Sequence, residues 1–222
     1  MNDANRNHLQ AVIPEWLANK LSFLKSKTES KESFFARVGD IFPTTDARYK
    51  LIDRAYDAAQ RAFRTHVRDD GEKYFEHLRA TALILLVHLR VDDADVIAAA
   101  LLHDICEDVD GWTHERLTSE FNERVAALVW WLTKPRQSDS YRTVGDIDRK
   151  YHRNLRRAPR KAVMIKLADR LHNLLTIWSQ DPARVRAKIS ETKDFIMPLA
   201  ERHIMLIHEL EDALRAVEEQ VT

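Results

Sequence analysis

The stretch AAALLHDICEDV, residues 98–109, places four ionisable side chains inside an otherwise apolar, alanine-rich run. Such a run predicts a buried helix. At the helical repeat His103 lies one turn from Glu107, which brings these two side chains onto one arc. Asp104 lies one turn from both Glu107 and Asp108 and joins the same arc. Neighbouring buried carboxylates repel each other unless a cation or water compensates them, so the stretch predicts a hydrolytic metal site.

The rest of the chain has the apolar spacing of a helical protein. Apolar residues recur at i, i+3 and i+4, no alternating strand pattern competes, and the four glycines fall between the periodic segments. We expect helices over residues 8–25, 34–41, 46–64, 75–89, 93–109, 114–121, 123–133, 162–179 and 182–219, the last kinked or split at Pro198. The predicted fold class is all-α, a bundle of roughly eight to ten helices.

The chain divides into two parts by sequence pattern. Residues 1–45 are expected to form a helical appendage, and residues 46–222 the main domain, including the long C-terminal helix. Either Thr45 or Asp46 is the predicted N-cap for the first helix of that domain. Residues 134–161 carry ten Lys or Arg against three Asp. This basic connection is either a solvated, mobile loop with one helix in it, or a rim that offers arginines to phosphates: Arg153, Arg156 or Arg157.

Composition excludes several classes of protein. Lys plus Arg and Asp plus Glu both total 35, so a general nucleic-acid binder is not expected. The single cysteine, Cys106, excludes an intramolecular disulfide, fits a reducing compartment and is interpreted as a small buried residue. The chain has no signal-peptide pattern, no apolar run that spans a bilayer and no glycine-rich phosphate loop. We therefore expect a cytoplasmic protein without a membrane or nucleic-acid partner.

A second polar cluster interrupts an apolar helix at KLADRLHNL, residues 166–174. Asp169 and Asn173 share one face there. Taken singly, Asp169–Arg170 has the ordinary explanation of a surface ion pair, and His77, at a helix start, that of a surface residue. Taken together with His103 and Asp104, they supply two histidines and two aspartates, a ligand set that suits manganese, iron or zinc.

These motifs occur in a recognisable order. Tyr74 to His77, ALLHDICEDV, Leu128–Val129 followed by Thr133–Lys134, and IKLADRLHNL are arranged as in the HD-superfamily hydrolase domain of Rel/SpoT enzymes and the small alarmone hydrolases. The similarity continues into ETKDFIMPLAERH and HELEDAL and covers residues from about 46 to 215. The chain thus resembles an HD-type phosphohydrolase as a whole, not through one dipeptide.

The resemblance implies a helical hydrolase that removes pyrophosphate from the ribose 3′ position of ppGpp or pppGpp. It implies one Mn²⁺, with Fe²⁺ or Zn²⁺ as alternatives, and these ligands: His77, His103, Asp104 and Asp169. Glu107 and Asp108 match the acidic pair that positions and activates the attacking water. The implied substrate-binding residues are Arg68, against the guanine base, with Lys73, Asn173 and Thr176. His172 is interpreted as a supporting residue, because one helix cannot aim residues 169, 172 and 173 at one ion equally well.

The chain departs from the family pattern near the nucleotide. Asp69 and Asp70 stand where the family commonly has a basic residue and a serine, Trp131 replaces a small residue, and Leu174–Leu175 replaces Met-Arg. Two alternatives therefore accompany the alarmone hydrolase. One is the same machinery acting on a deoxynucleotide or a phosphorylated dinucleotide. The other is a regulatory module that binds a nucleotide without hydrolysing it, against which the acidic pair argues.

Overall fold

The computed structural model describes residues 13–25, 29–68, 71–135, 143–177 and 181–221. Over these ranges the chain is helical and contains no strand, only an isolated bridge between Val67 and Lys73. The all-α prediction is confirmed. None of the helices in these ranges has the length and apolar character needed to cross a membrane.

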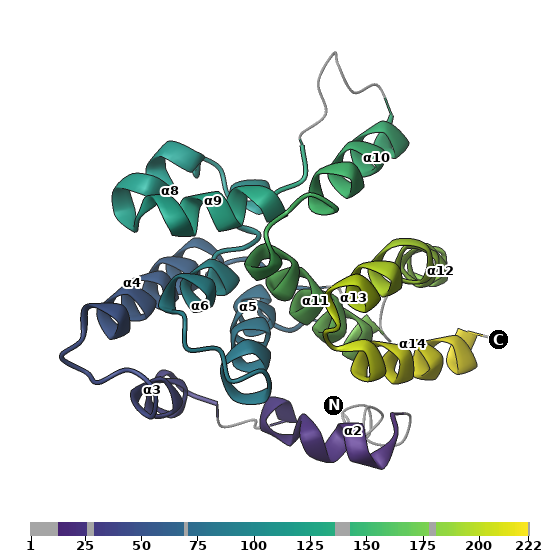
Figure 1. Ribbon diagram of the computed structural model, residues 1–222, viewed down its shortest axis with the longest axis horizontal. Coiled ribbons are helices and arrows are strands. Elements are labelled where there is room, and N and C mark those ends of the chain that lie inside the picture. Colours follow the sequence, from purple (N-terminus) through teal and green to yellow (C-terminus); the bar gives the residue numbers. More distant parts are fainter. Residues whose placement is uncertain (1–12, 26–28, 69–70, 136–142, 178–180, 222) are drawn as a thin grey trace.

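Figure 1 shows how the helices are arranged. In chain order they are α2 (Glu15–Lys20), η2 (Ser22–Lys25), α3 (Lys31–Gly39), α4 (Ala47–Ala62), α5 (Tyr74–Leu83), η3 (Ile84–His88), α6 (Ala94–Leu101), α7 (Ile105–Asp108), α8 (His114–Glu120), α9 (Glu123–Leu132), α10 (Val144–Leu155), α11 (Arg160–Leu175), α12 (Pro182–Glu191), η5 (Thr192–Ile196), α13 (Met197–His203) and α14 (Ile207–Val221). Asp46 caps α4 by accepting a hydrogen bond from the Arg48 backbone N–H, as predicted.

Helix α11 runs through the middle of the molecule (Figure 1). It packs against α5, α6, α9, α13 and α14. Leu167, Leu171 and Leu174 are fully buried along it, and Asp169 lies between them and is buried as well. A carboxylate is thereby held inside the core by a helix that neighbours enclose on several sides.

The helix expected over residues 93–109 is wrong in one respect, because it is broken at the His-Asp pair. Helix α6 ends at Leu101, α7 begins at Ile105, and His103 and Asp104 lie in the turn between them. The His103 Nδ1–H donates to the Ala100 carbonyl at 2.7 Å. A side chain that bonds to a nearby carbonyl competes with the helical ladder, and here the break turns both side chains toward α5 and α11.

The C-terminal helix expected over residues 182–219 is divided, but not at Pro198. Pro198 lies in the first turn of α13, directly after the π-helical segment η5, whose wider turn precedes the residue that lacks an N–H. The break comes at residues 204–206, where Ile204 and Leu206 have positive φ angles of 50° and 55°. The Met205 N–H bonds to the Ala200 carbonyl, as in a Schellman motif that ends α13.

The N-terminal segment shares the core of the main domain. Leu17 and Leu21 on α2 and Phe34 on α3 are buried in the same cluster as the residues of α11. Lys20 lies 2.9 Å from Glu209 on α14, and the His88 Nε2 lies 2.9 Å from the same carboxylate. Whether residues 1–45 form a separate unit stays a prediction, but Glu209 on α14 contacts both Lys20 of α2 and His88 of η3.

The basic stretch 134–161 is largely structured. Helix α10 occupies its middle, and Tyr151 and Leu155 on that helix are buried against the core. Residues 136–142 lie outside the described ranges. The stretch therefore supplies a packed helix rather than only a solvated loop.

Replacing Glu209 by Gln tests the contacts of α14 with α2 and η3 through the pH dependence of stability. The hydrogen bond from His88, together with Lys20, lowers the pKa of Glu209 to about 2 against the effect of burial. The contribution of the Glu209 carboxylate to the free energy of unfolding should therefore be fully present above its ordinary pKa of 4.5. This contribution should be lost as the pH falls toward 2. We expect Glu209→Gln to lose less over this window. Urea unfolding at stepped pH measures the difference, and parallel curves for the two proteins would contradict it.

Candidate metal centre

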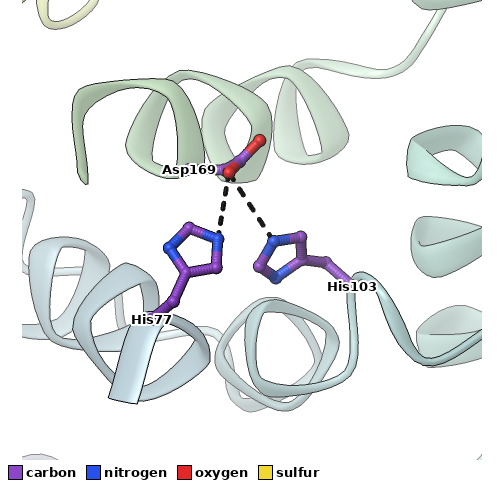
Figure 2. A group of neighbouring side chains, drawn as sticks. All are labelled: His77, His103 and Asp169. Carbon is purple, nitrogen blue, oxygen red and sulfur yellow. Dashed lines mark ion pairs between the residues drawn. The ribbon is translucent and has the colours of Figure 1, made fainter. Parts of the chain in front are cut away.

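Three side chains from separate elements meet inside the molecule. His77 comes from α5, His103 from the α6–α7 turn and Asp169 from α11, and all three are buried (Figure 2). The Asp169 Oδ1 lies 3.2 Å from the His77 Nε2 and 3.8 Å from the His103 Nε2. The three ligand atoms all lie within 4.8 Å of one another, a spacing that a single metal ion can bridge.

Hydrogen bonds turn one nitrogen of each histidine toward the centre. The His103 Nδ1 donates to a carbonyl, and among the described residues no group forms a hydrogen bond with its buried Nε2. The His77 Nδ1 lies 2.8 Å from the His172 Nδ1, so His172 occupies that nitrogen and leaves Nε2 facing the carboxylate. An imidazole whose other nitrogen is held by a hydrogen bond is the usual form of a metal ligand. His172 thus lies behind His77, on the side of that ring away from Asp169, and not among the three converging ligand atoms.

Asp104 adds a fourth donor at the edge of the cluster. Its Oδ2 lies 3.1 Å from the His103 Nε2 and 3.9 Å from the His77 Nε2. The Tyr74 hydroxyl donates to the same oxygen at 2.7 Å, and the Tyr74 ring stacks on Phe63. Burial and Asp104 raise the pKa of Tyr74, so this hydroxyl stays protonated and keeps donating. Tyr74 therefore orients Asp104.

The electrostatics of the cluster favour a positive charge at its centre. Burial raises the pKa of Asp104, but His103 outweighs it and brings the pKa to about 2. Burial likewise lowers the pKa of His103, yet Asp104 and Asp169 raise it well above its usual value. Burial lowers the pKa of His77, which keeps that ring neutral. Two charged carboxylates beside two imidazole nitrogens fit a divalent cation.

Asp169 is held by residues of its own helix. The Lys166 Nζ donates to Oδ2 at 2.8 Å, and the Asn173 Nδ2 donates to Oδ1 at 2.5 Å. Burial raises the pKa of Asp169, but Lys166 and the two histidines hold it well below its usual range. Lys166 and Tyr74 received no role from the sequence. Lys166 is three residues before Asp169, which is the signal that could have identified it.

The acidic pair lies beside this cluster on α7. The Glu107 Oε1 accepts a hydrogen bond from the Lys134 backbone N–H at 2.6 Å, which fixes the carboxylate. Burial and Asp104 raise the pKa of Glu107 to about 7. Burial and Asp104 also raise the pKa of the more exposed Asp108. An acid that titrates near neutral pH suits proton transfer.

The expected substrate residues are only partly brought together. The Arg68 Nη2 donates to the Asn173 Oδ1 at 3.0 Å, and Nη1 lies 3.4 Å from the His172 Nδ1, so Arg68 and Asn173 border the cluster. The Thr176 hydroxyl instead donates to the His172 carbonyl of its own helix. Lys73 is exposed just before α5, and within the described ranges neither it nor Thr176 bonds to the His-Asp cluster. Asp69 and Asp70 lie outside those ranges.

Arg170 does not form the surface ion pair that its sequence context alone suggested. It is buried, and its Nη2 lies 2.6 Å from the Glu191 Oε2 at the end of α12. It also donates to the Thr192 hydroxyl. The residue next to Asp169 therefore belongs to a separate ion pair that joins α11 to α12 and η5.

Comparisons with known proteins agree with this geometry. The family model described as HD domain matches residues 55–205. The chain is 37% identical over 157 residues to a probable GTP pyrophosphokinase of Mycobacterium leprae, a match that covers 70% of this chain and 19% of the relative. It is 36% identical over 151 residues to a guanosine-3′,5′-bis(diphosphate) 3′-pyrophosphohydrolase of Aquifex aeolicus, covering 68% of this chain and 21% of the relative.

A solved structure shows the same fold. It is described as a metazoan orthologue of SpoT that hydrolyses ppGpp; it superposes with a TM-score of 0.67 at 24% identity and covers 80% of this chain and 98% of that chain. The chain spans about a fifth of the two curated relatives named above. Because the family model extends over more than half of the sequence and includes His77, His103 and Asp169, the chain belongs to the HD domain family.

Proposed function

We propose that this protein hydrolyses the 3′ pyrophosphate of ppGpp or pppGpp and releases pyrophosphate with GDP or GTP. The observation that carries the proposal is the convergence of His77, His103 and Asp169, whose ligand atoms lie within 4.8 Å of one another, with Glu107 close enough to Asp104 to feel its charge. The Aquifex aeolicus relative, which is named for this activity, supports the choice of substrate. The buried His-Asp set supports hydrolysis over the kinase activity in the name of the Mycobacterium leprae relative.

The proposed metal ligands are His77, His103, Asp104 and Asp169. When bound there, a divalent ion lowers the pKa of a coordinated water and offsets phosphate charge. Two imidazoles with two carboxylates suit Mn²⁺, and Fe²⁺ and Zn²⁺ accept the same donors. We propose Mn²⁺ as the resident ion.

Glu107 and Asp108 are the proposed acids for the water. Glu107 lies next to Asp104 and has a pKa near 7, so at neutral pH it accepts a proton from water that attacks the phosphorus. The bond between that phosphorus and the ribose 3′ oxygen breaks, and the 3′ oxygen takes up a proton. Asp108, more exposed on the same short helix, is placed to orient the water from the solvent side.

Arg68 and Asn173 are the proposed first contacts for the nucleotide. Their hydrogen bond fixes the guanidinium group at the border of the metal cluster, and a planar guanidinium stacks well on a planar base. Thr176 lies one turn beyond His172, and Lys73 is exposed at the start of α5. We propose that both reach the nucleotide only when it is bound. Nucleotides other than ppGpp are alternative substrates because the sequence carries Asp69 and Asp70, and two acids repel a nearby phosphate.

A substrate panel tests the proposal. The full chain with Mn²⁺ is incubated with ppGpp, pppGpp, deoxynucleotides and phosphorylated dinucleotides, and the released pyrophosphate, phosphate and nucleotide are measured. We expect pyrophosphate with GDP or GTP from the alarmones. Hydrolysis of another member alone would move the proposal to that nucleotide, and tight binding without turnover would identify a regulatory module.

Removing Asp104 should abolish metal retention. Asp104→Ala deletes a charged donor that lies 3.1 Å from the His103 Nε2, so we expect Mn²⁺ to be lost during gel filtration, as measured by elemental analysis. Asp212→Ala is the control. Asp212 lies on α14, where it accepts a hydrogen bond from Trp16 and pairs with Arg215, and it has no part in the proposed ligand set. Full retention of Mn²⁺ by folded Asp104→Ala would remove Asp104 from the ligand set.

Removing Glu107 should separate metal binding from turnover. Glu107→Ala leaves the four proposed ligands in place, so we expect it to keep Mn²⁺. We expect kcat to fall by about 10²–10⁴-fold, the range for losing a general base. Steady-state kinetics on a preparation of known metal content measures this, and normal turnover would show that another group accepts the proton.

A further inference from the structure

The side chain of Lys166 is directed into the molecule beside the metal cluster. Only 14% of it is exposed, and its Nζ lies 2.8 Å from the Asp169 Oδ2. The same nitrogen lies over the ring of Tyr151 from α10, 5.5 Å from the ring centre, and Tyr151 is itself buried. Burial between a carboxylate and an aromatic face fixes the ammonium group in one place.

The two oxygens of Asp169 have different partners. Oδ1 is the atom nearest to the ring nitrogens of His77 and His103. Oδ1 also accepts a hydrogen bond from the Asn173 Nδ2, which lies on the same helix. Oδ2 accepts a hydrogen bond from the Lys166 ammonium group. An ammonium group has three donors and no acceptor, so this contact always occupies a lone pair of the carboxylate. In the structure only Oδ1 is directed at the histidines.

We propose that Lys166 is a positioning residue that restricts Asp169 to binding the metal ion through Oδ1 alone. The inference rests on the metal site proposed above, but not on the identity of the nucleotide. A carboxylate binds a cation through either one or both oxygens. With Oδ2 held by Lys166, Asp169 takes one coordination position, and the remaining positions stay open to water and a substrate phosphate.

Counting ligands gives the inference a measurable form. Manganese prefers about six ligands, and four protein donors leave about two positions for water. If Asp169 bound through both oxygens, about one position would remain. The number of exchanging waters on Mn²⁺ is obtained from the relaxation rate of solvent protons, without any substrate or turnover.

The experiment compares four forms of the full chain loaded with Mn²⁺. Wild type and Lys166→Arg, which keeps a cationic donor, are expected to retain about two waters. Lys166→Met keeps the length of the side chain but removes the donor, and we expect it to lose one water, so that the inner-sphere relaxation falls about twofold. Lys161→Met is the matched control, because Lys161 lies on the same helix and pairs with Asp93 at the surface.

Each outcome decides a separate point. Failure of wild type to bind Mn²⁺ would overturn the metal site and this inference with it. A wild-type count of about one water, or an unchanged count in Lys166→Met, would overturn the inference alone. Loss of Mn²⁺ by folded Lys166→Met would also overturn it, since Lys166 would then build the site rather than limit it. If Lys166→Met does not fold, the wild-type count decides.

Discussion

The carboxylate of Asp169, buried in the middle of α11, is the constraint on which the site depends. A buried charge is costly unless neighbouring groups compensate it. Here the compensation comes from three directions: Lys166 within the helix, His77 from α5 and His103 from the α6–α7 turn. Each of these partners is itself fixed by packing or by a hydrogen bond to another element. The metal centre is therefore the meeting point of the same helices that form the core, and it requires no separate scaffold.

The sequence predicted which segments are helical more accurately than it predicted where those helices break. Apolar spacing located α4, α8, α9 and α11 to within a few residues. It did not reveal the break between α6 and α7, because alanine and leucine continue the helical pattern and the competing bond from His103 to the Ala100 carbonyl is a single local contact. Periodicity placed His103 and Glu107 on one arc of a helix. The structure instead separates them, with His103 in the turn and Glu107 on the next short helix.

Contacts between distant segments account for the residues that were missed. His77 and Asp169 could be joined to the His103–Asp104 pair only through the resemblance of several motifs, since periodicity does not say which helices pack together. Tyr74 and Lys166 stood inside the quoted motifs without a role. Their function depends on what lies across from them, and that information is absent from spacing along one chain segment. The spacing of apolar residues along the sequence thus predicts the helices, whereas the contacts between side chains of different helices depend on how those helices pack.

Neighbouring residues on α11 show how two ion pairs coexist in one core. Successive residues of a helix point about 100° apart, so Asp169 and Arg170 face different neighbours. Asp169 is directed toward the histidines and Lys166, whereas Arg170 is directed toward Glu191 on α12. Glu191 also lies 3.1 Å from His152 on α10, which extends the second pair to a third helix. Because each charge has its own counter-charge on its own side, Arg170 does not have to neutralise Asp169, and the negative charge of Asp169 stays directed at the metal centre.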